Sequence, residues 1–322
     1  MAEPLPWRDA WHVALYGPEG FYRAADGPAG HFATAAQGPL GEVLAEALGG
    51  LADREGAVHV VDVGAGRGEL LTALRAARPD LGLTGVDVVE RPGALPDDIA
   101  WLRSPGGAGL PGALTDLEDV LVVANEWLDV VPCTVARVEG GRLVALLVDP
   151  VTGAETPGPP LGADDAAWCA AHWPADDLPD GARVEVGLAR DRAWDDLVGR
   201  VRRGTVVAAD YGHTRGNRPP GGSLVAYRAG TLVDPVPDGG CDLTAHVAVD
   251  SLTADTVTTQ ADALRGLGVD AARPSVEDAR TDPAGYLAAL SRASAAASLL
   301  DPRGFGGFAW VARRVGAADW RT

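Results

Sequence analysis

The first clear periodicity in the chain is helical. Leu40, Val43, Leu44 and Leu48 fall on one face when residues 39–56 are wound at 3.6 residues per turn. This spacing predicts a helix with one buried side. Shorter, nearly continuous apolar runs follow it and alternate with a second amphipathic segment. They predict strands at 57–64, 81–89, 99–104 and 120–124, and a helix over 67–80 that ends at Pro79.

This order of elements predicts an α/β fold with a mostly parallel sheet. The connections between the predicted strands are long enough for parallel pairing. Because the strands are rich in valine and leucine at successive positions, we expect helices on both faces of the sheet.

The pattern changes after residue 132. Residues 133–149 resemble a hairpin that turns at Gly140 and Gly141, and residues 151–181, rich in proline, glycine and aspartate, are interpreted as an irregular insertion. No internal repeat is evident. The remaining expectations are a helix at 190–203, a strand at 204–210, a loop at 211–222, two or more helices in 253–300 and a last strand in 305–315.

Composition narrows the class of protein. The chain has 322 residues, a net charge of −18, and no apolar run near the roughly 20 residues of a membrane span. All 27 basic residues are arginine. We therefore expect no membrane and no nucleic-acid partner, since an acidic surface repels phosphate. A basic protein partner fits the charge, although the charge could also serve solubility alone.

The cysteines and the start of the chain indicate a cytoplasmic protein. Cys133, Cys169 and Cys241 are far apart and have no histidine at metal-ligand spacing, so we expect neither disulfides nor a metal site. The first residues carry acids and prolines, which predicts no signal peptide.

A glycine-rich turn follows the first predicted strand. Gly64, Ala65, Gly66 and Gly68 lie where that strand gives way to a helix, and such glycines let the backbone approach a ligand closely. The dinucleotide fingerprint G-x-G-x-x-G would need glycine at Glu69, and a carboxylate there opposes a pyrophosphate but not a cationic ligand. S-adenosylmethionine (SAM) is such a ligand; the alternative is a purely structural turn.

Two aspartates support an adenosine ligand. Asp87 ends the second predicted strand, 19 residues after Gly68, where an acid can accept hydrogen bonds from ribose hydroxyls in NAD and SAM enzymes alike. Asp62 lies at the end of the first strand and suits an ammonium group.

A second cluster follows the fourth predicted strand. Asn125, Glu126 and Asp129 lie beyond its carboxyl end, where open α/β sheets bind ligands. A glutamate beside a methyl donor can hold a guanidinium through two hydrogen bonds. The alternative is that Asn125 and Asp129 cap a helix and Glu126 is a solvated acid in its first turn.

Seven segments in order resemble the MidA-like SAM-dependent methyltransferases, which are related to the mitochondrial complex I assembly methyltransferase. The resemblance covers about residues 20–313. The segments are GHFATAAQGPLGEVLAEAL, VVDVGAGRGELL, VVANEWLDVVPC, VVAADYG, GGCDLTAHVAVDSL, TTQADALRGLGV and LLDPRGFGGFAWVARR.

The resemblance implies a class I SAM-methyltransferase fold of Rossmann-like type. Its domains would be an N-terminal helical extension at 1–56 covering the site and a SAM-binding domain at 57–322 with insertions at about 151–181 and 213–300. It implies SAM contacts from Gly64, Gly66, Gly68 and Asp87 and active-site roles for Asn125, Glu126 and Asp129. It also places Thr34, Asp210, Tyr211 and His246 near the cleft.

The chain departs from the family pattern at three acidic positions. Asp62 stands where the family has glutamate, and His31 and Gln37 replace two acids in the N-terminal motif. The last two changes bear on the part of the fold expected to cover the donor or the substrate.

The expected activity is methyl transfer to an arginine of a protein partner. Glu126 would localise the guanidinium charge, assisted by Asp129 or Asp210, while His246 or His31 would accept a proton or serve a structural role. The alternatives are a small-molecule methyltransferase, a non-catalytic SAM-binding assembly factor and, more remotely, a nicotinamide-dependent reductase. We also expect that the chain can form a homodimer.

Overall fold

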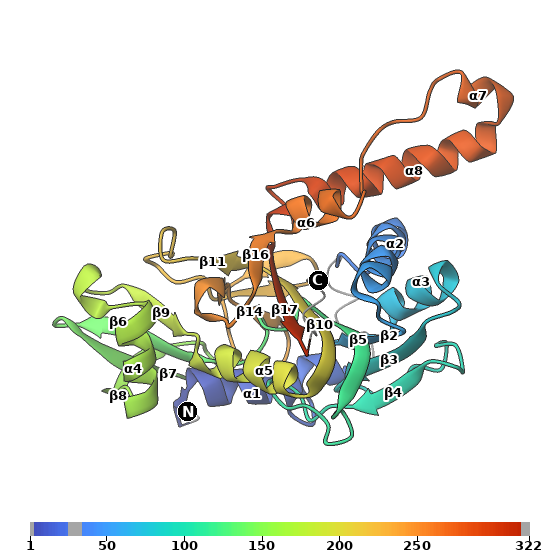
Figure 1. Cartoon of the computed structure of the whole chain (residues 1–322). Helices are drawn as coiled ribbons and strands as arrows, with labels where there is room; N and C mark the ends of the chain where they lie inside the picture. Colours follow the sequence, from blue (N-terminus) through green and yellow to red (C-terminus); the bar gives the residue numbers. More distant parts are fainter. Residues whose placement is uncertain (1–2, 25–33, 317–322) are drawn as a thin grey trace, which may run out of the picture.

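A seven-stranded sheet forms the centre of the computed structural model, which describes residues 3–24 and 34–316 (Figure 1). The strand order is β16-β17-β10-β5-β2-β3-β4. The strands from β10 to β4 run parallel, whereas β17 is antiparallel to both of its neighbours. The bounds are β2 His59–Val63, β3 Gly82–Asp87, β4 Ala100–Arg103, β5 Leu117–Asn125, β10 Val201–Asp210, β16 Thr256–Thr259 and β17 Ala309–Val315.

Alternate residues of each central strand enter different cores. Leu121, Val123 and Val207 pack on one face of the sheet, and their neighbours Val122 and Val206 pack on the other. Both faces are therefore apolar, which is why the strands read as continuous runs and why the predicted parallel sheet is confirmed.

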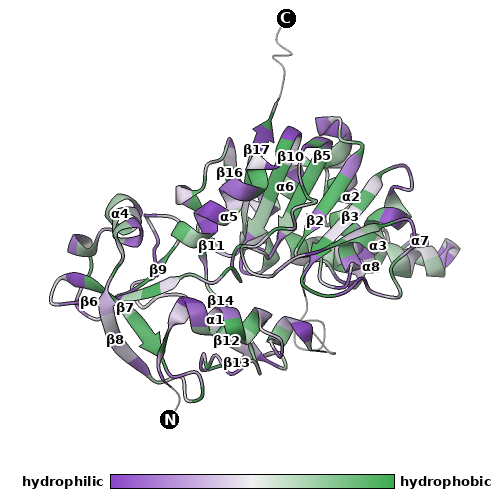
Figure 2. Cartoon of the chain, turned by 90° about the horizontal axis from the view of Figure 1, so that it is seen from below, coloured by the Kyte–Doolittle hydropathy of each residue, from purple (hydrophilic) through white to green (hydrophobic). Residues whose placement is uncertain are grey.

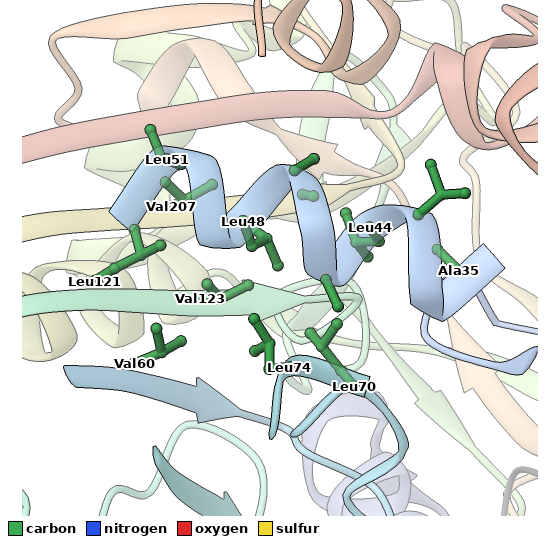
Figure 3. Packing of buried hydrophobic residues seen from close by; sticks show 14 of the residues in the cluster. Ala35, Leu44, Leu48, Leu51, Val60, Leu70, Leu74, Leu121, Val123 and Val207 are labelled. Carbon is green, nitrogen blue, oxygen red and sulfur yellow. The ribbon is translucent and has the colours of Figure 1, made fainter. Parts of the chain in front are cut away.

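Helices cover both faces. On one face, α2 (Gly38–Glu55) lies across β2, β5 and β10 with Leu44 and Leu48 turned toward the strands (Figure 3). The same core includes side chains of α3 (Glu69–Ala77), α6 (Gln260–Gly266) and α8 (Pro283–Leu300). On the other face, α5 (Leu188–Gly199) contributes Trp194 and Leu197. The two helices predicted in the first part of the chain are confirmed.

A second sheet of five strands lies beside the first (Figures 1 and 2). It contains the predicted hairpin, and α1 (Trp7–Tyr16) shares an apolar core with it. Its members are β1 Leu5–Pro6, β6 Thr134–Glu139, β7 Arg142–Val148, β8 Glu155–Pro160 and β9 Arg183–Val186.

The prediction of an irregular insertion at 151–181 is wrong. This segment holds β8 and α4 (Ala163–His172), whose Trp168 and Cys169 are buried. β8 contains Pro157, Pro159 and Pro160 and pairs only with β7, as expected of an edge strand that tolerates proline.

The segment 211–308 combines short strands with helices. The small sheets are β11 Gly212–His213 with β15 Val247–Ala248, and β13 Thr231–Val233 with β12 Val225–Arg228 and β14 Asp242–Thr244. Three helices, α6, α7 (Asp278–Thr281) and α8, confirm the helical prediction for 253–300, which also holds strand β16. Single 3₁₀ turns lie at η1 Phe21–Arg23, η3 Ala175–Asp177, η4 Val249–Ser251 and η5 Phe305–Gly307.

The N-terminal half of α8, together with α7, extends away from the body of the molecule (Figure 1). Across residues 3–24 and 34–316, no helix combines the length and apolar character that crossing a membrane requires.

Candidate active site

A pocket opens at the carboxyl edge of the central sheet, where β2 lies between β3 and β5. The chain order reverses at β2, and such a switch point is where open α/β sheets bind ligands. The pocket is lined by the loops that follow these three strands and by Tyr16 and Tyr22 from the N-terminal segment.

The glycine turn forms one wall of this pocket. Gly64, Gly66 and Gly68 have φ values of +77°, +58° and +79°, a region that side chains disfavour. Gly64, Ala65 and Gly66 line the pocket, whereas Gly68 does not. Gly68 instead precedes α3, and a Cβ on it would lie 2.5 Å from Leu95. The turn therefore needs glycine for two reasons: all three positions have a positive φ, and at Gly68 a side chain would also collide with Leu95.

Asp87 fastens the end of β3 to the glycine turn. Its Oδ2 accepts the Gly66 N–H at 2.8 Å and its Oδ1 accepts the Val89 N–H at 3.2 Å. Burial raises its pKa to about 6, although these N–H groups favour the ionised form. Two carboxylate oxygens offer four acceptor positions in all, so acceptor capacity remains for a ligand diol.

Asp62 is more deeply buried, with 3% of its surface exposed at the end of β2. Burial, and secondarily the charge of Asp87, raise its pKa to about 7. No ion pair joins either carboxyl to an arginine within the residues that the structure describes. A cationic group in the pocket would therefore stabilise both carboxylates.

Glu126 holds an unusual backbone conformation directly after β5. Its φ is +53°, which costs a non-glycine residue of order 1–3 kcal/mol and persists only where the surroundings enforce it. Its N–H donates to the Ala209 carbonyl of β10 at 2.9 Å, and its Oε1 accepts from Asn125 Nδ2 at 3.1 Å and from the Ala35 N–H at 3.4 Å. These contacts turn the carboxyl group into the pocket.

The loss of solvation in this recess raises the pKa of Glu126 to about 8, and the charge of Asp129 adds to the shift. Glu126 is therefore an acid that a bound cation would ionise. Asn125 also lines the pocket, so the structure brings together the two polar residues predicted at the end of this strand.

Asp129 and Asp210 form a buried carboxyl pair. The Asp129 N–H donates to Asp210 Oδ1 at 3.2 Å, and Thr244 Oγ1 donates to Asp129 Oδ2 at 2.8 Å. Burial and then the charge of Asp129 raise the pKa of Asp210 well above its ordinary value. These effects favour the protonated form of Asp210.

Only Asp129 of this pair lines the pocket. Arg190 is close enough to lower the pKa of Asp129, but its guanidinium donates to the backbone carbonyls of Asp129, Val131, Ala245 and His246. The negative charge of the pocket is therefore left for a ligand.

The pocket also holds residues that sequence reasoning missed, among them Tyr16, Tyr22 and Asp242. Asp242 is buried and accepts the Tyr22 hydroxyl at 2.7 Å, while the Tyr16 hydroxyl donates to the Val130 carbonyl at 3.1 Å. Burial raises the pKa of Asp242 to about 7. Asp242 belongs to the segment GGCDLTAHVAVDSL, which was a signal, but nothing local marks the two tyrosines.

The remaining predicted site residues fall in different places. Thr34 and Gln37 line the pocket. His246 lies outside it, exposed, with its ring stacked on that of Tyr211. His31 lies outside the described residues. None of the residues 3–24 and 34–316 forms a cluster of three or more groups suited to holding a metal.

The pocket fits SAM in its chemistry. Asp87 presents acceptors for a sugar diol beside the glycine-rich turn. Asp62 and Glu126 are buried acids whose ionised forms the ammonium and sulfonium groups would stabilise. A pyrophosphate would be repelled by the Glu69 carboxylate. Oε2 of Glu69 lies 3.3 Å from the position that a Cβ on Gly66 would take.

Comparison with known proteins agrees with this fit. Residues 88–268 match the model of a family described as "putative S-adenosyl-L-methionine-dependent methyltransferase". A Burkholderia thailandensis protein described as a "likely methyl transferase", solved with S-adenosyl-homocysteine, has 24% identity and a TM-score of 0.77, over 98% of this chain and 89% of that one. A second B. thailandensis structure has 22% identity and a TM-score of 0.76, over 98% and 88%.

Neither structure is similar enough in sequence to show more than the fold, and no curated protein matches the chain. The family model, however, spans more than half of the sequence. It establishes S-adenosyl-L-methionine as the cofactor. The chain belongs to this family of S-adenosyl-L-methionine-dependent methyltransferases.

Proposed function

We propose that this enzyme transfers a methyl group from SAM to the guanidinium of an arginine in a protein partner. The observation that carries the proposal is the set of acids beside the donor site. Glu126, Asp129 and Asp242 all line one pocket, and no ion pair neutralises them among the described residues. Buried carboxylates without a cation are costly, and a guanidinium would offset that cost.

In methyl transfer the enzyme mainly orients the two reactants and stabilises charge. Bound SAM supplies a methyl carbon made electrophilic by its sulfonium. Glu126 accepts two N–H groups of the guanidinium and so orients the third nitrogen toward that carbon. Because guanidinium is protonated at neutral pH, transfer must release a proton, and the carboxylate of Asp129, which lines the same pocket, accepts it.

Location and partner follow from the same features. Cys133, Cys169 and Cys241 are all free and buried, which supports the predicted reducing cytoplasm. The net charge of −18 favours association with basic segments of a partner.

Label transfer tests the proposal. Purified enzyme is incubated with methyl-labelled SAM and either basic proteins or a lysate, and the protein and small-molecule fractions are separated. We expect label in the protein fraction, recovered as methylarginine after hydrolysis. Label confined to the small-molecule fraction would instead support a metabolite acceptor, and label on carboxyl oxygens would contradict a guanidinium site.

A further inference from the structure

The candidate site residues lie along the carboxyl edge of the central sheet, in an order set by the order of the strands. Asp87 ends β3, Asp62 is the penultimate residue of β2, Glu126 follows β5 and Tyr211 follows β10. These four strands are consecutive neighbours in the sheet. The donor-binding residues occupy the β3 and β2 positions. An acceptor that reaches Glu126 opposite the donor therefore approaches from the β10 side, where Tyr211 lies.

Aromatic rings are exposed on that side. Tyr211 leaves 39% of its surface exposed, and His246 is exposed as well. Their rings are 5.8 Å apart between centroids and within 15° of parallel. The buried ring of Phe308 supports Tyr211 from behind at 4.2 Å. A centroid distance of 5.8 Å is an offset stack, which leaves part of each ring face uncovered.

Hydrogen bonds hold the backbone under both rings. The His246 N–H donates to Ser223 Oγ at 2.9 Å, and Arg190 donates to the His246 carbonyl at 2.9 Å. The Val247 N–H donates to the Tyr211 carbonyl at 2.8 Å. Exposed rings on a fixed backbone lose little freedom when they bind a partner.

The electrostatic setting of the two rings suits a cation. Desolvation lowers the pKa of His246, so its imidazole is neutral at neutral pH. Burial, followed by the charges of Glu126 and Asp129, raises the pKa of Tyr211, so its hydroxyl stays protonated. The groups that act on these rings also include Glu185, Asp242 and Arg190. The result is a neutral aromatic surface within the field of the pocket acids.

We propose that Tyr211 and His246 form the outer half of the acceptor site, and that the side chain of the incoming arginine stacks on these rings as its guanidinium reaches Glu126. This inference rests on the proposed function, because it names how the same acceptor is recognised. A guanidinium stacked on an aromatic ring is attracted to the negative face of the ring, so such contacts favour binding.

Steady-state kinetics with an arginine-containing peptide test the proposal. We expect Tyr211→Leu and His246→Leu each to raise KM for the peptide by about tenfold, the upper range of such stacking, with kcat and the Kd for SAM unchanged. Tyr286→Leu on α8 is the matched control and is expected to leave KM unchanged. Equal KM values in all variants would overturn the proposal.

A binding measurement separates this proposal from the methylation itself. N-acetyl-arginine amide is added to enzyme saturated with S-adenosylhomocysteine, and the ring protons of His246, identified with His246→Leu, are followed by NMR. We expect those protons to shift. A shift without any methylation of arginine would support the Tyr211–His246 binding site and contradict the proposed arginine methylation. Methylation without a shift would contradict the Tyr211–His246 binding site and leave the proposed methylation standing.

Discussion

At the scale of single residues, we expect donor binding to depend most on Asp87. Its carboxylate accepts backbone N–H groups from Gly66 and Val89 and keeps acceptor capacity for a sugar. In Asp87→Asn, an amide N–H₂ would face these N–H donors and the charge would be lost. We expect the Kd for SAM to rise by roughly 10- to 100-fold, as for the loss of a charged hydrogen bond. Isothermal titration calorimetry measures it, with the exposed Asp98→Asn as a control that should bind normally.

Glu126 is the residue that the proposed chemistry requires. Glu126→Gln keeps the side-chain shape but cannot carry a charge, so we expect kcat/KM to fall by about 100-fold or more while SAM still binds. Glu118→Gln on the exposed end of the same strand is the control. Retention of full activity in Glu126→Gln would remove Glu126 from the reaction.

The pH dependence of kcat/KM is a second test of the role of Glu126. Burial raises the pKa of Glu126 to about 8, so its protonated form dominates at neutral pH in the unliganded pocket. Acceptor binding needs the ionised form, and kcat/KM should therefore rise with pH through about 8. This rise should be absent in Glu126→Gln.

At the scale of elements, α2 packs on one face of the central sheet. Leu48 is fully buried and faces β5 and β10 (Figure 3). We expect Leu48→Ala to lower the free energy of unfolding by about 2–5 kcal/mol, the usual cost of a large-to-small change in a core. Urea unfolding measures it. Leu287→Ala removes the same atoms from an exposed site on α8 and should change stability by less than about 0.5 kcal/mol.

The elements also show what local sequence can predict. The central strands were predicted because both of their faces are buried, which leaves a continuous apolar run. β8 was missed because its prolines, at 157, 159 and 160, read as loop residues, and only its place at an edge permits them. β16 (Thr256–Thr259) was read as part of a helical segment because it is short and pairs only with β17.

Some residues of the candidate site could likewise be predicted from the sequence, and others could not. Asp62, Asp87 and Glu126 could be predicted because each lies at the end of a strand whose direction the pattern had already fixed. The contact between Tyr22 and Asp242 could not, since the two residues are 220 positions apart and meet only through the tertiary fold. Their roles, like those of the other site residues, stay predictions that substitution must test.

At the scale of the whole molecule, the buried acids link stability to pH. Burial raises the pKa of Asp62, Asp242 and Glu126 to about 7, 7 and 8. The folded state therefore binds more protons than the unfolded chain between about pH 4 and pH 8, and stability is lost as pH rises through that range. The net charge of −18 acts in the same direction through self-repulsion.

We therefore expect Tm to fall by several degrees between pH 5 and pH 8.5, as measured by calorimetry. The slope should be shallower in Asp62→Asn, which removes one of these titrations. Saturating SAM should restore part of the lost stability, because ligand binding favours the folded state. A Tm that rises over this range would contradict the assignment of buried, unpaired carboxyls.

The most direct test is a crystal structure of the enzyme with S-adenosylhomocysteine and an arginine-containing peptide. We expect the ribose hydroxyls to bind Asp87, the amino group of the ligand to lie near Asp62, and Glu126 to hold the guanidinium between the sulfur and Tyr211. Adenosine bound away from Asp87, or a peptide arginine that leaves Glu126 without contact, would contradict these expectations.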